Sequence, residues 1–158
     1  MDDSFCTAVE ALDPSFRRLI AMAALKALPL PRGIPARGAP GVYLFSEGDQ
    51  HLYVGRTNRL RERLLEHGRP SSRHDSAPFA FLLAREKTGR TIASYKKNGS
   101  RRDLEGDPQF ADAFMAAKRR VRAMNIRFIE ERDPLRQALL EIYVAVALRT
   151  PYNDFDTH

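Results

Sequence analysis

The sequence predicts an α+β domain in which helices flank a small β-sheet. Several segments repeat apolar residues at helical spacing, whereas three short segments are rich in β-branched and aromatic residues. The segments occur in the order helix, strand, strand, helix, helix, helix, strand, helix, which suits a small three-stranded antiparallel or mixed sheet. The 158 residues, 43% of them hydrophobic, are enough for one domain with its own core.

The first forty residues form a unit of their own in this interpretation. Residues 15–27 predict a helix, because Pro14 suits a first turn and apolar residues recur every three or four positions. Residues 28–40 contain several prolines and glycines, so we expect an irregular arm. The main domain then covers residues 41–155.

The remaining elements follow from periodicity, capping residues and breakers. Thr57 or Asn58 is expected to cap the helix after the hairpin, and Gly68 to end that helix. We expect strands at 41–45, 52–54 and 125–129, helices at 79–85, 108–120 and 134–149, and an exposed loop or short hairpin at 86–107.

Two tyrosines lie on the two strands of the predicted hairpin. A three-residue loop would place Tyr43 directly opposite Tyr53 on one face, whereas a two-residue turn would place them on opposite faces. A shared face therefore requires an odd loop or a bulge, with Gly48 or Asp49 in a left-handed conformation. The alternative is that both tyrosines are ordinary packing residues.

The helix after the hairpin carries a basic stripe. Arg59, Arg63 and His67 are spaced four residues apart, so they share one face of the helix. Arginine and histidine side chains beside apolar contacts suit phosphate binding and proton transfer. The alternative is a solvated face whose charge is interrupted by Glu62 and Glu66.

One carboxylate interrupts the apolar run of the last helix. Ten of the eleven residues in 138–148 are apolar and the other is Glu141, which predicts a helix buried on nearly all sides. A buried carboxylate needs a partner, which a divalent cation or Arg63 would provide. Alternatively, Glu141 lies on the one exposed stripe of the helix.

The composition limits the partners and the setting. The net charge is +6 and the pI is about 9.8, and residues 85–102 alone hold seven basic residues and one acid. Such a charge favours nucleic acid as a partner. With one cysteine, Cys6, the chain forms no internal disulfide, and no apolar run is long enough for a membrane span, so we expect a cytoplasmic protein.

The combination of motifs resembles the GIY-YIG nuclease superfamily. The name motif corresponds to Gly41-Val42-Tyr43 and, ten residues on, Tyr53-Val54-Gly55. Arg63 falls at the position of the family's arginine, and His67 at that of the histidine in its phage homing endonucleases. Glu141 resembles the family's metal-binding glutamate, and Asn153 its late asparagine. Arg56 stands where the repair members have lysine. The chain departs from the family in reading GVY for GIY, in a long basic insertion at about 85–107 and in residues 1–40.

The resemblance implies a DNA endonuclease that uses one Mg²⁺ or Mn²⁺ ion bound by Glu141. Arg63 would contact the scissile phosphate, Tyr53 would position the phosphate or water, and Tyr43 or His67 would be the general base. The expected DNA-contacting residues are Arg56, Arg59, Asn153, Lys87, Arg90, Lys96, Lys97, Arg101 and Arg102.

Two alternatives stay open at this point. In the first, the chain is a nucleic-acid-binding module with the nuclease fold and little or no activity. In the second, its polar residues form a buried structural network. The sequence also leaves open sequence-specific against structure-specific cleavage, and a monomer against a homodimer.

Overall fold

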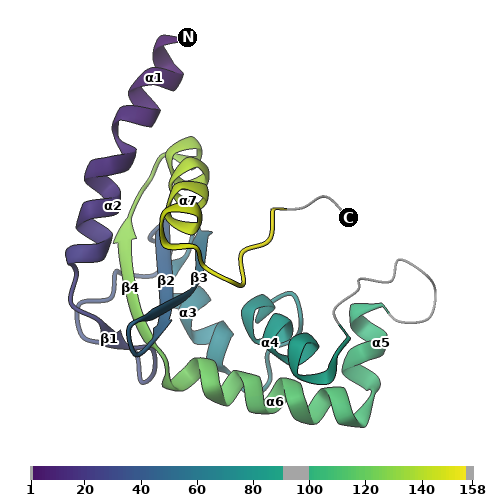
Figure 1. Cartoon of the computed structure of the whole chain (residues 1–158). Coiled ribbons are helices and arrows are strands. Elements are labelled where there is room, and N and C mark those ends of the chain that lie inside the picture. The colour runs from purple at the N-terminus through teal and green to yellow at the C-terminus, as the bar shows by residue number, and fades with distance from the viewer. Residues whose placement is uncertain (1, 91–99, 156–158) are drawn as a thin grey trace.

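The computed structural model of the chain describes residues 2–90 and 100–155, and it is an α+β structure (Figure 1). The described helices are α1 (Asp3–Glu10), α2 (Leu12–Ala21), α3 (Leu60–Gly68), α4 (Pro78–Thr88), α5 (Arg101–Gly106), α6 (Pro108–Ala123) and α7 (Pro134–Leu148). The strands are β1 (Leu25–Lys26), β2 (Gly41–Glu47), β3 (Gln50–Thr57) and β4 (Asn125–Glu130), in the antiparallel sheet order β1-β4-β2-β3.

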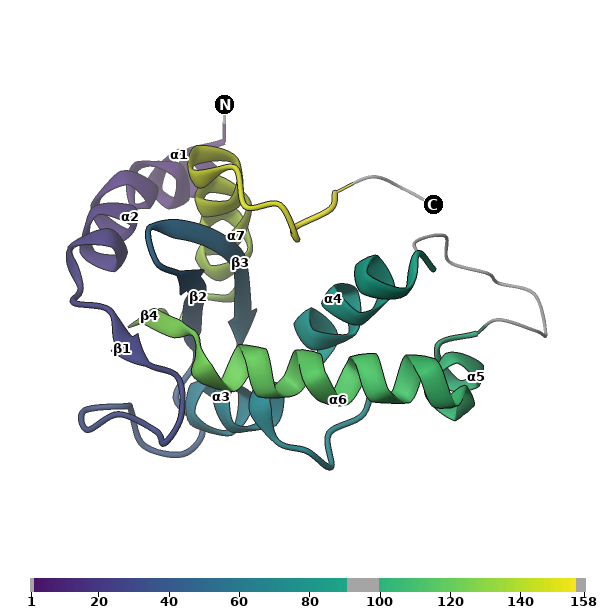
Figure 2. The same cartoon turned by 60° about the horizontal axis from the view of Figure 1, so that its bottom comes forward.

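The sheet lies between two helical layers. Val42, Leu44 and Val54 pack toward α2 and α7, whereas Tyr43 and Phe45 pack toward α3, α4 and α6. Figure 2 shows α2 and α7 on one side of the strands, and α3 and α6 on the other. Because alternate residues of a strand point to opposite faces, the two tyrosines belong to the layer of α3 and α4.

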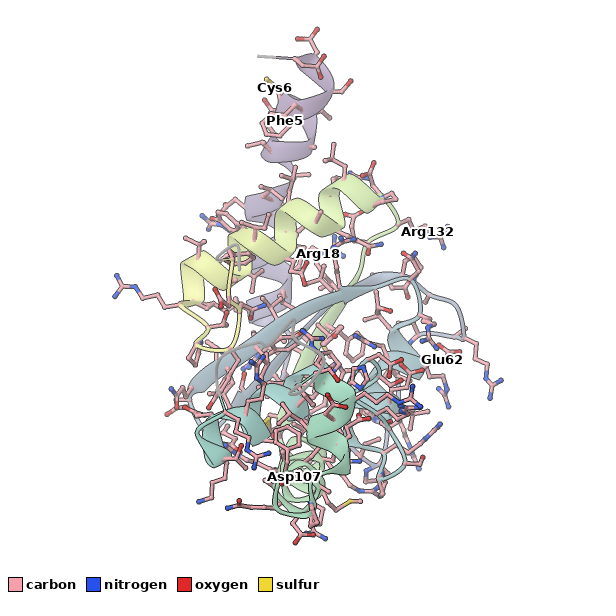
Figure 3. The ribbon with its side chains drawn as sticks, turned by 90° about the vertical axis from the view of Figure 1, so that its right-hand side faces the viewer. Phe5, Cys6, Arg18, Glu62, Asp107 and Arg132 are labelled. Carbon is pink, nitrogen blue, oxygen red and sulfur yellow. The ribbon has the colours of Figure 1, made fainter. Side chains whose placement is uncertain are left out.

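The N-terminal region differs from its prediction in two ways. Two helices, α1 and α2, replace the single helix expected at 15–27, and Leu25–Lys26 form a fourth strand against β4. Helix α2 ends at Ala21 because the chain turns into extended backbone at Met22, where it can pair with the exposed edge of β4. Helix α1 projects beyond the body of the molecule, with Phe5 and Cys6 near its free end (Figure 3).

The hairpin register confirms the shared face of the tyrosines but not their direct pairing. Tyr43 pairs with Gly55 and Tyr53 pairs with Phe45, so the tyrosines are diagonal neighbours on one face. The register shifts after Phe45 because Leu52 is an extra residue in β3, and Gly48 has a φ of 54°. The expected bulge and left-handed turn residue are therefore both present.

The expected cap of the third helix is wrong. Arg59 occupies the N-cap position of α3 without a side-chain capping bond, and Thr57 accepts a hydrogen bond from the Arg59 amide instead. The arm supplies the missing acceptor, because the Leu60 amide donates to the Ala39 carbonyl over 2.8 Å. The irregular arm is thus attached to the start of the helix that follows the hairpin.

The later helices begin as predicted, because α6 and α7 both start with an Asp-Pro pair. Asp107 and Asp133 accept hydrogen bonds from backbone amides of the first turn, and proline occupies the position where no amide partner is needed. The segment expected to be a loop or hairpin at 86–107 is partly helical, since α4 continues to Thr88 and Arg101–Gly106 form α5.

Helix α7 is less buried than its sequence predicts. Ile142 and Val146 are 47% and 66% exposed, so the expectation of burial on nearly all sides is wrong. The buried side, which includes Leu140 and Val144, packs on the sheet. Within residues 2–90 and 100–155, no helix has the length and apolar character needed to cross a bilayer.

Candidate active site

Two glycines of the tyrosine motifs lie where a side chain does not fit. A β-carbon on Gly55 would lie 2.4 Å from the hydroxyl oxygen of Tyr43, and one on Gly41 would lie 2.1 Å from the Ile129 carbonyl oxygen. These distances are far below normal contact distances, so both positions require glycine. Gly55 therefore lets the Tyr43 phenol lie against the backbone of edge strand β3.

The Tyr43 hydroxyl and Nε2 of His67 form a buried hydrogen bond of 2.8 Å. Tyr43 is 1% exposed and His67 is fully buried, and Nδ1 of His67 has no partner among the described residues. Burial lowers the pKa of His67 to about 3, with the charge of Arg63 acting in the same direction. His67 is therefore neutral at physiological pH.

Tyr43 and Tyr53 are electrostatically coupled to Arg63 and Glu141. Burial and the neighbouring charge of Tyr53 raise the pKa of Tyr43 well above its usual range, whereas Arg63 lowers it and Glu141 raises it. Burial and Glu141 raise the pKa of Tyr53 to about 12, and Arg63 again opposes them. The structure thus brings together Tyr43, Tyr53, Arg63 and Glu141, although Glu141 comes from the helix on the opposite face of the sheet.

Tyr53 is less enclosed than Tyr43. Its ring stacks on Phe79 of α4, with ring centroids 4.8 Å apart and planes 7° apart, and it lies 6.4 Å from the Tyr43 ring. The stack fixes the direction of the ring, and Tyr53 as a whole is partly exposed. Phe79 is therefore a supporting residue that sequence reasoning missed, because a buried phenylalanine in an apolar segment carries no distinguishing pattern.

Arg63 is held by groups on its own helix and on the following loop. Its Nη1 lies 3.4 Å from the carbonyl oxygens of Asp75 and Ser76, and 3.6 Å from a carboxylate oxygen of Glu66. The loop is held in turn by Lys118 of α6, whose ammonium donates to backbone carbonyls of residues 70 and 72. Lys118 is a buried positioning residue that its helical pattern did not reveal.

The arginine that pairs with Glu141 is Arg56 and not Arg63, the arginine that the sequence suggested. Nε of Arg56 lies 3.1 Å from the Oε2 atom of Glu141, and the two side chains are 47% and 25% exposed, respectively. Burial raises the pKa of Glu141, and the Arg56 guanidinium partly offsets the shift. Arg63, the expected arginine partner, instead points to Glu66 and the loop carbonyls.

The side chain of Asn153 is used inside the protein. Its Oδ1 accepts from the Val54 amide over 2.9 Å, its Nδ2 donates to the Val54 carbonyl over 2.8 Å, and Thr150 donates to the same Oδ1. These bonds satisfy the Val54 backbone on the outer side of β3, where no further strand pairs with it among the described residues. Asn153 therefore has a structural role beside the site, and its expected contact with DNA stays a prediction.

Several expected DNA contacts are also paired within the protein. Arg59 makes a bidentate ion pair with Glu66, Arg90 pairs with Asp107, and Arg101 lies over the Phe81 ring. Lys87 and Arg102 are exposed. Lys96 and Lys97, together with the aromatic residue Tyr95 between the basic residues, lie outside the described residues.

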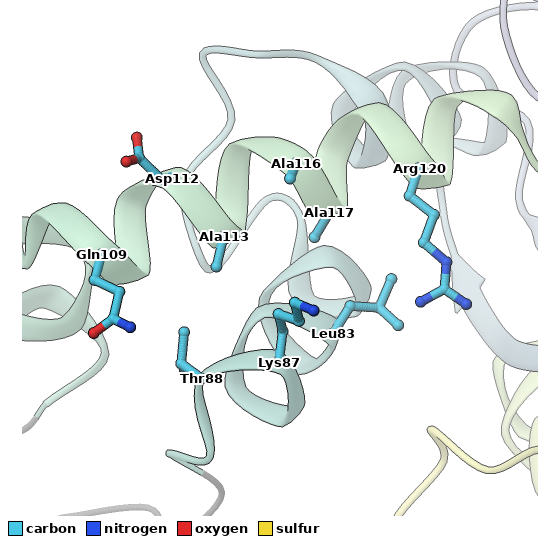
Figure 4. Close-up of a pocket in the computed structure, with 9 residues that line it drawn as sticks. All are labelled: Leu83, Lys87, Thr88, Gln109, Asp112, Ala113, Ala116, Ala117 and Arg120. Atoms are coloured by element: carbon cyan, nitrogen blue, oxygen red, sulfur yellow. The ribbon is translucent and has the colours of Figure 1, made fainter.

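A groove between α4 and α6 lies apart from these residues (Figure 4). It has a volume of about 460 Å³, an apolar floor that includes Leu83, Ala113 and Ala117, and Lys87 at its side. None of the five expected catalytic residues lines it. The candidate site is therefore the surface at the edge of β3 rather than this groove.

The available donors permit one hard cation with few protein ligands. Among the residues that the structure describes, no three His, Cys, Asp or Glu side chains group together to hold a metal ion. Glu141 offers a partly exposed carboxylate whose charge acts on both tyrosines. Mg²⁺ and Mn²⁺ suit such a site, because Mg²⁺ commonly takes one or two protein carboxylates and completes its shell with water and phosphate oxygens.

Comparison with known proteins identified no relative of the chain. No protein-family model, no curated protein and no solved structure matches the chain. The geometry of Tyr43, Tyr53, Arg63, His67 and Glu141 is accordingly the basis on which function is considered.

Proposed function

We propose that the chain is a divergent GIY-YIG-type endonuclease that hydrolyses DNA with a divalent metal ion. The observation that carries the proposal is the convergence of the five predicted residues at the edge of β3. Tyr43 is hydrogen-bonded to His67, and the charges of Arg63 and Glu141 both act on Tyr43 and Tyr53. A convergent set of titratable groups with shifted pKa values supports a catalytic role.

In the proposed reaction Tyr43 takes the proton of the attacking water. Its pKa is raised by burial, so its phenolate form depends on neighbouring positive charge, which Arg63 supplies in part. His67 is buried like Tyr43, its pKa of about 3 makes it a weaker proton acceptor than a Tyr43 phenolate, and it forms a hydrogen bond with the Tyr43 hydroxyl. His67 is therefore a positioning residue that fixes the Tyr43 hydroxyl.

Arg63 and Glu141 would act on the phosphate. The Arg63 guanidinium, held near Tyr43, would stabilise the negative charge that develops on the phosphate oxygens. Glu141 would hold Mg²⁺ or Mn²⁺, which would add positive charge at the phosphate and at the leaving oxygen. Tyr53, which is partly exposed, would donate a hydrogen bond from its hydroxyl to a phosphate oxygen or to the attacking water.

The Arg56–Glu141 ion pair favours a second candidate, a DNA-binding module that lacks activity. In that case Arg56 would satisfy Glu141 permanently and no metal would bind there. The basic surface residues Lys87 and Arg102 would still attract DNA, and the affinity would fall steeply with salt.

A plasmid-nicking assay separates the two candidates. Purified wild type is incubated with supercoiled DNA and Mg²⁺ or Mn²⁺, beside Glu141→Ala and beside wild type in EDTA. We expect open-circular product from wild type with metal alone. Binding in a gel-shift assay without cleavage by wild type, across supercoiled, linear and branched DNA, would support the inactive module and overturn the nuclease proposal.

A further inference from the structure

The carboxylate that the proposed function assigns to a metal ion already holds a cation of the protein itself. Arg56 Nε lies 3.1 Å from Glu141 Oε2, and within the described ranges no other basic side chain is within ion-pair distance of Glu141. The pair joins edge strand β3 to helix α7, 85 residues apart in the sequence. It therefore depends on the folded arrangement of the site.

Arg56 is placed so that it can leave this carboxylate. It directly follows Gly55 on the edge strand and its side chain is about half exposed, whereas Glu141 is three-quarters covered. Because Arg56 is more exposed than Glu141, the arginine is the member of the pair that has room to move toward solvent. Its guanidinium is also the side chain best suited to bind a phosphate in two-point contact.

We propose that Arg56 occupies the Glu141 site in the free protein and competes there with the divalent cation until DNA phosphate draws it away. DNA binding would then favour metal binding, and metal binding would favour DNA binding, because a coupling between two ligands is reciprocal. This inference rests on the proposed nuclease function. It adds an order of binding to that function, because the Glu141 carboxylate becomes free to bind the metal ion when DNA arrives.

The first test measures Mn²⁺ binding without DNA, by titration calorimetry or from the EPR signal of free Mn²⁺. Arg56→Gln should bind Mn²⁺ about fivefold more tightly than wild type, which corresponds to ~1 kcal/mol for the lost competing ion pair. Arg119→Gln on α6 removes the same charge from the opposite side of the sheet and should match wild type. Glu141→Gln should abolish the gain in the Arg56→Gln background.

The second test adds DNA and measures the coupling. A short duplex is titrated in a Tyr43→Phe background, which keeps the DNA intact while Mn²⁺ binding is recorded. The duplex should tighten Mn²⁺ binding about fivefold more when Arg56 is present than when residue 56 is glutamine. Equal tightening in both backgrounds would show that Arg56 does not move to the phosphate.

Two further outcomes would overturn the inference. Unchanged Mn²⁺ affinity in Arg56→Gln, with a lower melting temperature, would make the pair a purely structural link. Equal Mn²⁺ binding by Arg56→Gln and by Arg56→Gln/Glu141→Gln would place the ion elsewhere. If wild type nicks plasmid while either result is obtained, the inference fails and the nuclease activity stands, although the second result would also remove Glu141 as the metal ligand. If wild type nicks no DNA, the proposed function fails whatever the Mn²⁺ titrations show.

Discussion

Replacing Gly55 by alanine tests whether the tyrosine motif is built around the Tyr43 phenol. The new β-carbon would lie 2.4, 2.5 and 3.0 Å from Oη, Cζ and Cε2 of Tyr43. The ring cannot retreat freely, because it is 1% exposed and is hydrogen-bonded to His67 over 2.8 Å. Overpacking of this kind typically costs about 1–3 kcal/mol.

The assay is urea unfolding of a double-mutant cycle. Gly55→Ala should lower the free energy of unfolding by about 1–3 kcal/mol in wild type but by almost nothing in Tyr43→Leu, because leucine lacks the three crowded atoms. Gly106→Ala is the matched control, since a β-carbon there meets no atom within 4 Å. The same cost of Gly55→Ala in both backgrounds would refute the reasoning.

Gly55→Ala should also lower activity beyond its effect on stability. A displacement of the Tyr43 hydroxyl by about 1 Å is expected to reduce cleavage about a hundredfold. The rate is measured under conditions where the variant is fully folded, as judged by circular dichroism. Wild-type cleavage by a folded Gly55→Ala protein would show that the position of Tyr43 does not matter for the chemistry.

Three further predictions concern His67, Asn153 and Arg102. Burial lowers the pKa of His67 to about 3 from its usual 6.5, so the unfolded chain binds the proton first. Wild type should therefore lose up to ~1.4 kcal/mol of stability per pH unit from this residue as the pH falls below about 6.5. In urea unfolding at pH 6.5 and 5.5, the free energy of unfolding should decline less in His67→Gln than in wild type. Parallel declines would contradict this. Asn153→Ala should lower the free energy of unfolding by about 1–3 kcal/mol by exposing the β3 edge, with an unchanged DNA affinity of the folded protein, whereas a weaker affinity would support a phosphate contact. Arg102→Gln should reduce the salt slope of DNA binding by about one unit, and an unchanged slope would remove Arg102 from the interface.

The sequence predicts most of the architecture because local signals agree there. Helices α6 and α7 start with Asp-Pro pairs, and β4 contains β-branched and aromatic residues. These local features are enough to predict the three elements. The two-residue strand β1 was missed because it forms only by pairing with β4. The cap of α3 was misassigned because its acceptor, the Ala39 carbonyl, comes from the distant arm.

The sequence predicted that the two tyrosines share a face, but it did not predict the partners of the polar residues near them. The spacing of Tyr43 and Tyr53 sufficed for a shared face once a bulge was allowed. The partner of Glu141 was not predictable, because Arg56 reaches it only across the edge of the sheet. The hydrogen bonds of Asn153 to Val54 were not predictable, because no local pattern indicates that its amide matches the backbone of that residue.

The central claim is that Tyr43, Arg63 and Glu141 act together in DNA hydrolysis. Single-turnover cleavage of a labelled duplex or of supercoiled plasmid in Mg²⁺ measures this directly for wild type, Tyr43→Phe, Arg63→Gln and Glu141→Gln, each verified as folded. We predict that wild type cleaves and that each variant is slower by at least about a hundredfold, as for loss of a group that stabilises the transition state. Absence of cleavage by wild type, or wild-type rates in all three variants, would contradict the account.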